Sequence, residues 1–174
     1  MGDAAYRARE TVLREFRWAN GHSDVWRLAE DPASFAAVTA GLAALASESS
    51  PTAIAGIETR GVLFGAPVAR ELGLGFHVIR KTDGLFAGAQ HSVTSAPDYR
   101  ERSYLLRTRD TLAPGDRVVL VDDWIERGSQ AAAARTLIEM ARAELVGVAV
   151  IVDQSDGSLP VRGLVTAAEL PPSN

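Results

Sequence analysis

The sequence predicts an α/β fold in which a mainly parallel β-sheet is flanked by helices. Short, continuous apolar runs, typical of strands buried on both faces, alternate with segments whose apolar residues recur at helical spacing. The clearest runs are residues 117–121 (RVVLV) and 145–152 (LVGVAVIV). Because the 174 residues contain no internal repeat and no linker, we expect a single domain over residues 1–174.

The first half of the chain predicts two helices before the first strand. Residues 4–17 have helical spacing and precede a loop around Asn20-Gly21. Asp31 and Pro32 are typical of an N-cap and a first helical turn, and that helix should end at residues 49–51. The elements expected next are a strand over 52–57, a helix over 61–72 and a strand over 73–79.

The second half begins with a long polar segment. Residues 80–99 predict a mobile loop or hairpin, and loops of this length in compact domains are usually functional or disordered. After a turn at residues 114–116, we expect a strand over 117–121, a helix over 127–143, a strand over 145–152 and a weaker strand over 161–168.

Composition excludes several classes of protein. The chain has no cysteine, which excludes disulfides and thiolate sites, and its three histidines lie far apart without metal-ligand spacing. A formal net charge of −4 provides no chain-wide basic field for DNA or RNA. No apolar run approaches the ~20 residues of a membrane span, and the N-terminus lacks a signal-peptide pattern. We therefore expect a cytoplasmic protein without membrane or nucleic-acid partners.

Polar residues follow three of the predicted strands. They are Glu58-Thr59-Arg60-Gly61, Arg80-Lys81 and the segment from Asp122 to Ser129. In a parallel sheet, ligands bind in the crevice at the carboxyl ends of the strands. We therefore expect the three segments to lie close together.

The adjacent carboxylates Asp122 and Asp123 have two interpretations. They can accept hydrogen bonds from a sugar diol or hold a hydrated Mg²⁺. Alternatively, one of them caps the helix that follows. A nucleoside-triphosphatase role is excluded because the chain contains no GxxxxGK[ST] loop.

Three cations follow the first two strands. Arg60, Arg80 and Lys81 beside a helix N-terminus suit a polyphosphate, since Arg donates bidentate hydrogen bonds and the helix dipole favours anions. The alternative is that they are solvated surface charges. Their shared position at the expected sheet edge favours the binding role.

Three separate motifs carry a family resemblance. Residues 56–76 (GIETRGVLFGAPVARELGLGF), the following VIRK, and residues 117–134 (RVVLVDDWIERGSQAAAA) resemble the adenine branch of the type I phosphoribosyltransferase family. The upstream segment from Val25 is similar to that branch's nucleobase side. The resemblance covers roughly residues 21–153.

The resemblance implies a transferase of purine salvage. A phosphoribosyl group passes from phosphoribosyl pyrophosphate to an adenine-like base, and pyrophosphate leaves. It also implies Mg²⁺, held mainly by the pyrophosphate and through water by Asp122 or Asp123, and a homodimer. The expected ligands are phosphoribosyl pyrophosphate or a related sugar phosphate, and a purine base or nucleotide.

Residue by residue, the resemblance implies the following site. Asp122 and Asp123 hold the ribose hydroxyls. Arg60, Arg80 and Lys81 lie on the pyrophosphate side, with Glu58 and Thr59 in the same turn as Arg60. Val25 and Arg27 lie beside the base. A flexible hood over approximately residues 82–108 closes over the reacting centre. Within it, Asp98 and Tyr99 match a Glu-Tyr pair whose Glu is an acid or base near the purine.

One motif departs from the family pattern. Where the family has Ala, Thr, Gly, Gly and Thr around a 5′-phosphate, this chain has Glu126, Arg127, Gly128, Ser129 and Gln130. Three outcomes are open: Glu126 repels the phosphate, Arg127 points inward and offsets the charge, or the Glu126 carboxylate itself occupies the anion site. The neighbouring Trp124 is interpreted mainly as core packing.

Two functional hypotheses follow from this departure. The first is an active purine-type phosphoribosyltransferase with a modified phosphate loop. The alternative is a catalytically silent relative that binds a nucleotide or nucleobase as a regulatory or partner protein. The intact Asp122-Asp123 pair, Arg60 and Arg80 favour the enzyme, whereas the loop from Glu126 to Gln130 favours the silent relative.

Overall fold

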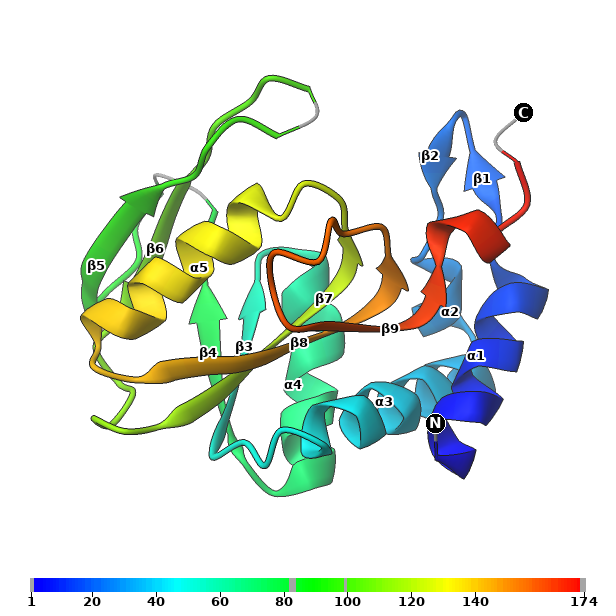
Figure 1. Cartoon of the computed structure of the whole chain (residues 1–174), viewed down its shortest axis with the longest axis horizontal. Coiled ribbons are helices and arrows are strands. Elements are labelled where there is room, and N and C mark those ends of the chain that lie inside the picture. Colours follow the sequence, from blue (N-terminus) through cyan, green and yellow to red (C-terminus); the bar gives the residue numbers. More distant parts are fainter. Residues whose placement is uncertain (1, 82–83, 99, 173–174) are drawn as a thin grey trace.

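The central element of the protein is a five-stranded parallel sheet (Figure 1). The computed structural model describes residues 2–81, 84–98 and 100–172. The strand order is β4-β3-β7-β8-β9, and every neighbouring pair runs parallel. The strands are β3 (Ala53–Ile57), β4 (Gly75–Ile79), β7 (Arg117–Ile125), β8 (Glu144–Asp153) and β9 (Val161–Thr166). The predicted α/β fold with a mainly parallel sheet is confirmed.

Helices cover both faces of this sheet. On one face lie α1 (Asp3–Glu15), α3 (Pro32–Ser47) and α4 (Arg60–Leu72), with the short α2 (Arg27–Glu30) beside them. The other face is covered by α5 (Ser129–Met140) and by a hairpin of β5 (Ala89–Thr94) and β6 (Leu105–Arg109). A second small pair, β1 (Trp18–Ala19) and β2 (His22–Ser23), follows α1, and a 3₁₀ turn (Ala167–Glu169) follows β9.

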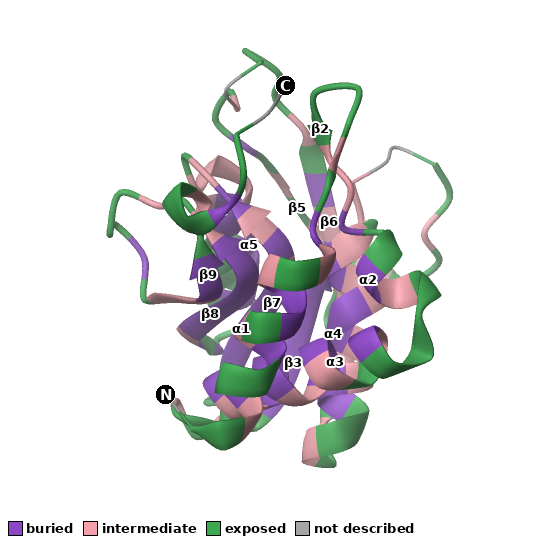
Figure 2. Cartoon of the chain, turned by 90° about the vertical axis from the view of Figure 1, so that its right-hand side faces the viewer, coloured by how far each residue is buried: buried purple, intermediate pink, exposed green. Residues whose placement is uncertain are grey.

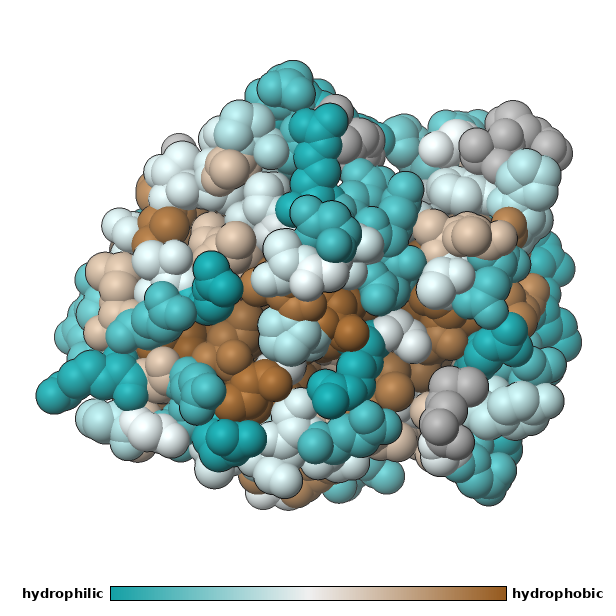
Figure 3. Space-filling model, viewed as in Figure 1, coloured by the Kyte–Doolittle hydropathy of each residue, from teal (hydrophilic) through white to brown (hydrophobic). Residues whose placement is uncertain are grey.

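The sheet separates two hydrophobic cores because side chains alternate along each strand. In β7, Val119 and Val121 pack against the α1, α3 and α4 side. Val118 and Leu120 of the same strand pack against the α5 side. Buried residues therefore run through the middle of the molecule (Figure 2). Apolar side chains also gather over the middle of one outer face, around β8 and α5 (Figure 3).

Two predicted loops contain strands. The loop around Asn20-Gly21 is a β1–β2 turn in which both residues have positive φ, 51° and 73°. Residues 80–99, predicted as a loop or hairpin, supply β5, whose burial alternates and which therefore has no continuous apolar run. The bridge between Arg80 and Arg107 then joins this hairpin to the end of β4.

The largest correction concerns β7, which continues beyond the predicted end at residue 121. Trp124 and Ile125 pair with Val152 and Asp153 of β8, so the strand is held to Ile125 by its neighbour. Asp122 and Asp123 therefore lie within the strand, not after it.

Helix ends agree more closely with the sequence. The Asp31 side chain accepts a hydrogen bond from the Ser34 backbone N–H at 2.7 Å, as expected of an N-cap. Gly73 ends α4 in the left-handed conformation (φ 69°), so β4 begins at Gly75. Among the described residues, no helix is long and apolar enough to span a membrane.

Candidate functional site

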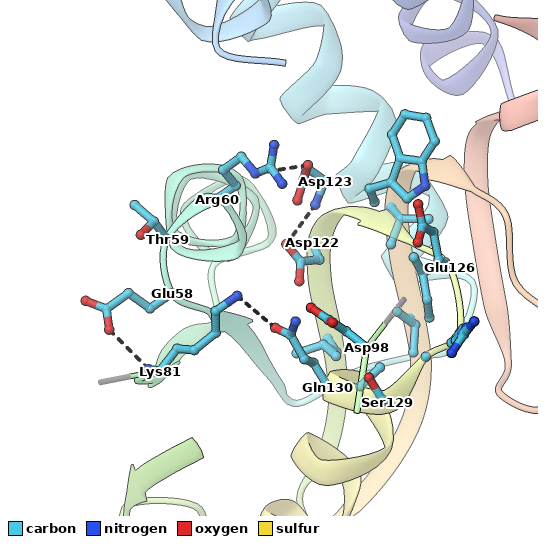
Figure 4. Close-up of a pocket in the computed structure, with 18 of the residues that line it drawn as sticks. Glu58, Thr59, Arg60, Lys81, Asp98, Asp122, Asp123, Glu126, Ser129 and Gln130 are labelled. Atoms are coloured by element: carbon cyan, nitrogen blue, oxygen red, sulfur yellow. Dashed lines mark hydrogen bonds and ion pairs between the residues drawn. The ribbon is translucent and has the colours of Figure 1, made fainter. Parts of the chain in front are cut away.

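A cavity of about 200 Å³ opens at the carboxyl edge of the sheet (Figure 4). Its walls come from the β3–α4 turn, the end of β4, the segment from β7 into α5, and the loop between β5 and β6. The cavity brings together most of the residues that the sequence predicted for the site: Glu58, Thr59, Arg60, Lys81, Asp98, Asp122, Asp123, Glu126, Arg127, Gly128, Ser129 and Gln130.

The centre of the cavity is an ion pair between α4 and β7. The Arg60 Nε atom lies 3.1 Å from Oδ2 of Asp123, whose side chain is buried. The Asp123 backbone N–H donates to Asp122 Oδ1 at 2.9 Å. Neither carboxylate caps the next helix: α5 begins after Gly128 and has no side-chain cap, so that interpretation of the pair is wrong.

Burial dominates the electrostatics of this pair. It raises the pKa of Asp122 well above the usual range, and the neighbouring Asp123 carboxylate raises it further, while Arg60 opposes both. Arg60 therefore offsets the burial and the like charge at Asp122 only in part. Groups that donate hydrogen bonds or bring positive charge would be favoured there.

These carboxylates fit a Mg²⁺ that arrives with its substrate. No cluster of three or more His, Cys, Asp or Glu side chains suited to a metal occurs within residues 2–81, 84–98 and 100–172. Mg²⁺ is commonly bound through one or two carboxylates together with substrate phosphates. Asp122 and Asp123 could hold the ion in that way.

The three predicted cations do not converge. Arg60 and Lys81 line the cavity, but Arg80 does not. The Arg80 Nε atom lies 3.3 Å from Glu58 Oε2, and its guanidinium lies over the Phe86 ring. Consecutive residues at a strand end point to opposite sides, which separates Arg80 from Lys81. Arg80 therefore does not join the other two in this structure, and its contact with a pyrophosphate stays a prediction.

Lys81 instead reaches across the cavity. Its backbone N–H donates to Glu58 Oε2 at 3.1 Å, and its Nζ donates to Gln130 Oε1 at 3.0 Å. The ammonium group also lies 4.4 Å from the centre of the Tyr104 ring. Lys81 thus connects the β4 end to the first turn of α5 (Figure 4).

The two residues predicted beside the base do not reach the cavity. Val25 is fully buried, and its side chain packs in the hydrophobic core on the α1, α3 and α4 side of the sheet. Arg27 is exposed and lines a separate depression with acidic residues of α1 and α2. The position of these two residues beside a base stays a prediction. Tyr99 lies outside the described residues.

The modified loop places a carboxylate in the cavity. Glu126 is half-buried there, and burial raises its pKa, with a smaller contribution from Asp98. Arg127 does not point inward: its Nη1 lies 3.6 Å from Glu101 Oε1, and 61% of its side chain is exposed. The N-cap of α5 is Gly128, which has a φ of 67° and receives no side-chain cap from Glu126.

Asp98 lines the cavity, but its carboxylate accepts hydrogen bonds from residues of its own loop. Its Oδ1 accepts backbone hydrogen bonds from Arg100 at 2.8 Å and Arg102 at 3.0 Å, and its Oδ2 accepts one from the Tyr104 hydroxyl at 3.2 Å. These bonds, with the Arg102 N–H foremost, lower the pKa of Asp98. Its carboxylate is therefore a weak base in this conformation.

The loop that carries Asp98 also contacts the β1–β2 turn. The Arg100 guanidinium lies 3.0 Å from His22 Nδ1. In Figure 1 the β5–β6 loop and the β1–β2 pair rise on the same side of the sheet. Residues from the N-terminal part and from the middle of the chain therefore border the same cavity, including Ser23 of β2, which sequence reasoning missed.

Trp124 has two neighbours of different kinds. Its ring packs against Trp18 at 5.9 Å and Phe16 at 6.3 Å between centres, as the core-packing interpretation expects. Its Nε1–H donates to Gln154 Oε1 at 3.1 Å. It also lines the cavity, together with apolar strand residues such as Leu120, Val148 and Val150. No sequence signal distinguishes these strand residues from ordinary core residues.

Two glycines allow α4 to approach the sheet. A Cβ on Gly56 would lie 2.2 Å from the Gly61 carbonyl oxygen. A Cβ on Gly61 would lie 2.8 Å from the Val121 carbonyl oxygen and 3.2 Å from Asp122 Oδ1. The absence of side chains at both positions places Arg60 beside Asp123.

Gly61→Ala is therefore expected to lower stability and to displace Asp122. Overpacking against backbone costs about 1–3 kcal/mol, or a melting temperature lower by roughly 2–12 °C for a chain of this size. Gly75→Ala is the matched control, because its Cβ would meet only His77 Nε2 at an ordinary 3.6 Å. Equal melting temperatures for the two variants would contradict the close-approach argument.

Comparisons with known proteins agree with this architecture. The family model described as phosphoribosyl transferase domain matches residues 25–169. An adenine phosphoribosyltransferase of Synechococcus sp. is 48% identical over 103 residues, which cover 59% of this chain and 59% of the relative's length. That of Streptomyces coelicolor is 40% identical over 130 residues, which cover 75% of this chain and 70% of the relative.

A solved structure resembles the whole fold. It is the adenine phosphoribosyltransferase of Saccharomyces cerevisiae, in complex with adenine and an imino-altritol bisphosphate. It is 25% identical to this chain, with a TM-score of 0.78, and the match covers 90% of this chain and 98% of the other.

Proposed function

This chain belongs to the phosphoribosyl transferase domain family, and we propose that it is a phosphoribosyltransferase of purine salvage. In this reaction, adenine receives the phosphoribosyl group of phosphoribosyl pyrophosphate and pyrophosphate leaves. The names of the relatives support adenine as the base. They are named as enzymes and lend no support to the catalytically silent alternative.

The observation that carries this proposal is the Arg60–Asp123 pair next to Asp122. The ribose of the donor has two neighbouring hydroxyls, which would donate to the two carboxylates. Because Arg60 Nε is 3.1 Å from Asp123 Oδ2, a pyrophosphate bound by Arg60 would lie next to that ribose. The N-terminus of α4, which begins at Arg60, adds a dipole that favours the pyrophosphate.

The same residues suit the chemistry of group transfer. As the bond from C1 of the ribose to pyrophosphate lengthens, positive charge develops on the sugar ring, and the carboxylates stabilise it. Arg60 and Lys81 would bind the departing pyrophosphate. Mg²⁺, when bound with the pyrophosphate, would supply further positive charge to the leaving group. The role of Asp98 as acid or base for the purine stays a prediction.

The remaining expectations belong to the same proposal. Residues 1–174 would form one domain, in which a hood over approximately residues 82–108 closes on the substrates and excludes water. The enzyme would act as a cytoplasmic homodimer on small-molecule substrates, without nucleic-acid or membrane partners. Its net charge of −4 supports the absence of a nucleic-acid partner.

A thermal-shift panel tests the binding part of the proposal. We expect stabilisation by phosphoribosyl pyrophosphate with Mg²⁺ and by adenine nucleotides. A ligand at 100 times its dissociation constant stabilises by about 2.7 kcal/mol, or roughly 5–10 °C here. Glucose 6-phosphate with Mg²⁺ is the control for unspecific phosphate effects. Unchanged melting temperatures with every purine and pentose ligand would contradict the proposal.

A further inference from the structure

Three cationic side chains line the cavity within the part of the chain that the structure describes: Arg60, Lys81 and Arg127. Two of them face carboxylates. Arg60 Nε lies 3.1 Å from Asp123 Oδ2, and Arg127 Nη1 lies 3.6 Å from Glu101 Oε1. A carboxylate partner offsets part of the charge that an arginine can offer to an anionic ligand. Lys81 differs from both, because the groups that hold its ammonium are uncharged.

Two elements that lie far apart in the sequence hold the Lys81 ammonium. Its Nζ donates to Oε1 of Gln130 at 3.0 Å, in the first turn of α5, and lies 4.4 Å from the centre of the Tyr104 ring, directly before β6. The Lys81 backbone is fixed as well, since its N–H donates to Glu58 Oε2 at 3.1 Å. Figure 4 shows the side chain extended between the β4 end and α5. Both ends of this flexible side chain are therefore held by the protein itself.

These uncharged partners hold the ammonium group without cancelling its charge. An amide oxygen and the face of an aromatic ring attract a cation, but neither carries a net charge. The ammonium group has three N–H donors, and Gln130 accepts one of them, so Lys81 can donate to a ligand at the same time. A free lysine side chain loses rotamer entropy when it binds an anion, and the existing contacts reduce that loss.

The contact with Gln130 comes from the loop in which this chain departs from the family pattern. Gln130 occupies a position where the family has threonine. A threonine hydroxyl lies two bonds closer to the backbone than the amide oxygen of glutamine, so it could not reach Lys81 Nζ from the same place on α5. The departure therefore supplies a partner for Lys81 that the family residue does not offer.

We propose that Gln130 and Tyr104 are positioning residues, which hold the Lys81 ammonium in the cavity through uncharged groups, so that its positive charge is offered to a phosphate group of the substrate. This inference rests on the proposed function and assigns a role to two residues around that same site. The phosphate group belongs either to the pyrophosphate or to the 5′ end of the nucleotide, and the two ligands used below distinguish these sources.

Calorimetric titration with pyrophosphate in the presence of Mg²⁺, and with AMP, tests the role of Gln130. Lys81→Met removes the ammonium and should weaken at least one of the two ligands by about tenfold or more. Gln130→Met keeps the length of the side chain and removes the acceptor, and it should weaken the same ligand by about three- to tenfold. The ligand that loses affinity identifies the phosphate group. Unchanged affinities in either variant, or a tighter complex with Gln130→Met, would overturn the proposal.

Two substitutions of Tyr104 separate its ring from its hydroxyl. Tyr104→Phe keeps the ring next to the ammonium and loses the bond from the hydroxyl to Asp98 Oδ2. It should therefore bind both ligands like wild type, within about twofold. Tyr104→Leu removes the attraction of the ring for the cation and should weaken the ligand that Lys81 binds by about three- to tenfold. Equal affinities of the two variants would overturn the proposal.

A double-mutant cycle distinguishes positioning from a general effect on the fold. In a Lys81→Met background, Gln130→Met and Tyr104→Leu should each change affinity by less than about twofold, because the group that they position is gone. Losses as large as in the wild-type background would show that both residues act independently of Lys81, which would overturn the proposal. The control for the loss of one positive charge is Arg135→Met, on an exposed arginine of α5 outside the cavity lining, which should leave both affinities unchanged.

Failure of this inference and failure of the proposed function give different results. If the wild-type protein binds pyrophosphate and AMP, and the Gln130 and Tyr104 variants bind them equally well, the positioning role is overturned while the proposed phosphoribosyl transfer stands. If the folded wild-type protein binds neither ligand, the proposed function itself fails, and the inference falls with it. A cooperative thermal transition in each variant shows that it is folded.

Discussion

Replacing Asp122 and Asp123 together by asparagine is expected to abolish measurable binding of phosphoribosyl pyrophosphate while the fold is kept. Asparagine has nearly the same shape, so α4 and β7 can pack as before. A hydrogen bond to a charged group contributes about 1.5–3 kcal/mol, and two such bonds to the ribose diol correspond to about a 100- to 10,000-fold loss of affinity. Calorimetry with Mg²⁺ present measures this loss.

The single variant Asp122→Asn tests how the raised pKa of Asp122 affects the stability of the fold. Burial and Asp123 raise the pKa of Asp122 in the folded protein. Folding therefore retains a proton on Asp122 that the unfolded chain releases above the ordinary aspartate pKa of about 3.9. Wild-type stability is lost progressively as the pH rises from about 4 through the raised pKa. Asp122→Asn avoids this loss, so it should melt higher than wild type at neutral pH.

The control for the charge change is Asp3→Asn, on an exposed side chain at the start of α1. It should change neither ligand affinity nor the difference in melting temperature between pH 4 and pH 8. A double variant that binds phosphoribosyl pyrophosphate like wild type would remove the ribose-site assignment. A lower melting temperature of Asp122→Asn at neutral pH would contradict the argument from burial.

Arg60→Ala is expected to weaken pyrophosphate far more than AMP. Its guanidinium is the cation that the structure places beside the aspartate pair, and AMP has no group at that end of the cavity. The loss of one or two charge-assisted bonds, at about 1.5–3 kcal/mol each, corresponds to about a tenfold to 10,000-fold loss for pyrophosphate. For AMP we expect less than about threefold.

Two further measurements accompany the experiment on Arg60→Ala. Arg70→Ala removes an exposed arginine from the other end of the same helix and should leave both ligands unaffected. Arg60→Ala also leaves the buried Asp123 carboxylate without its ion pair, so its melting temperature should fall. Equal losses of affinity for pyrophosphate and AMP would contradict the assignment of Arg60 to the pyrophosphate.

The fold could be predicted because its strands are apolar runs that are buried on both faces. The strands β3, β7 and β8 were visible in this way, and the residues at their carboxyl ends do meet in one cavity. The hairpin of β5 and β6 was less visible. One face of β5 is exposed, so its residues alternate and resemble a polar loop.

The direction of side chains was harder to predict than their position. Arg80 and Lys81 are neighbours in the sequence, yet Glu58 holds the Arg80 guanidinium outside the cavity. That contact joins residues that lie 22 positions apart, and no local pattern signals it. Likewise, nothing in the sequence separates Val25, which is buried in the core, from a residue that contacts a ligand.

The central claim is tested most directly by the stoichiometry of one reaction. Purified protein is incubated with Mg²⁺, phosphoribosyl pyrophosphate and isotopically labelled adenine, and labelled AMP and free pyrophosphate are measured together. We expect the two products to appear in equal amounts with the wild-type protein, and neither to appear with Asp122→Asn/Asp123→Asn. Binding of the substrates without labelled AMP, or equal product from the double variant, would contradict phosphoribosyl transfer at this cavity.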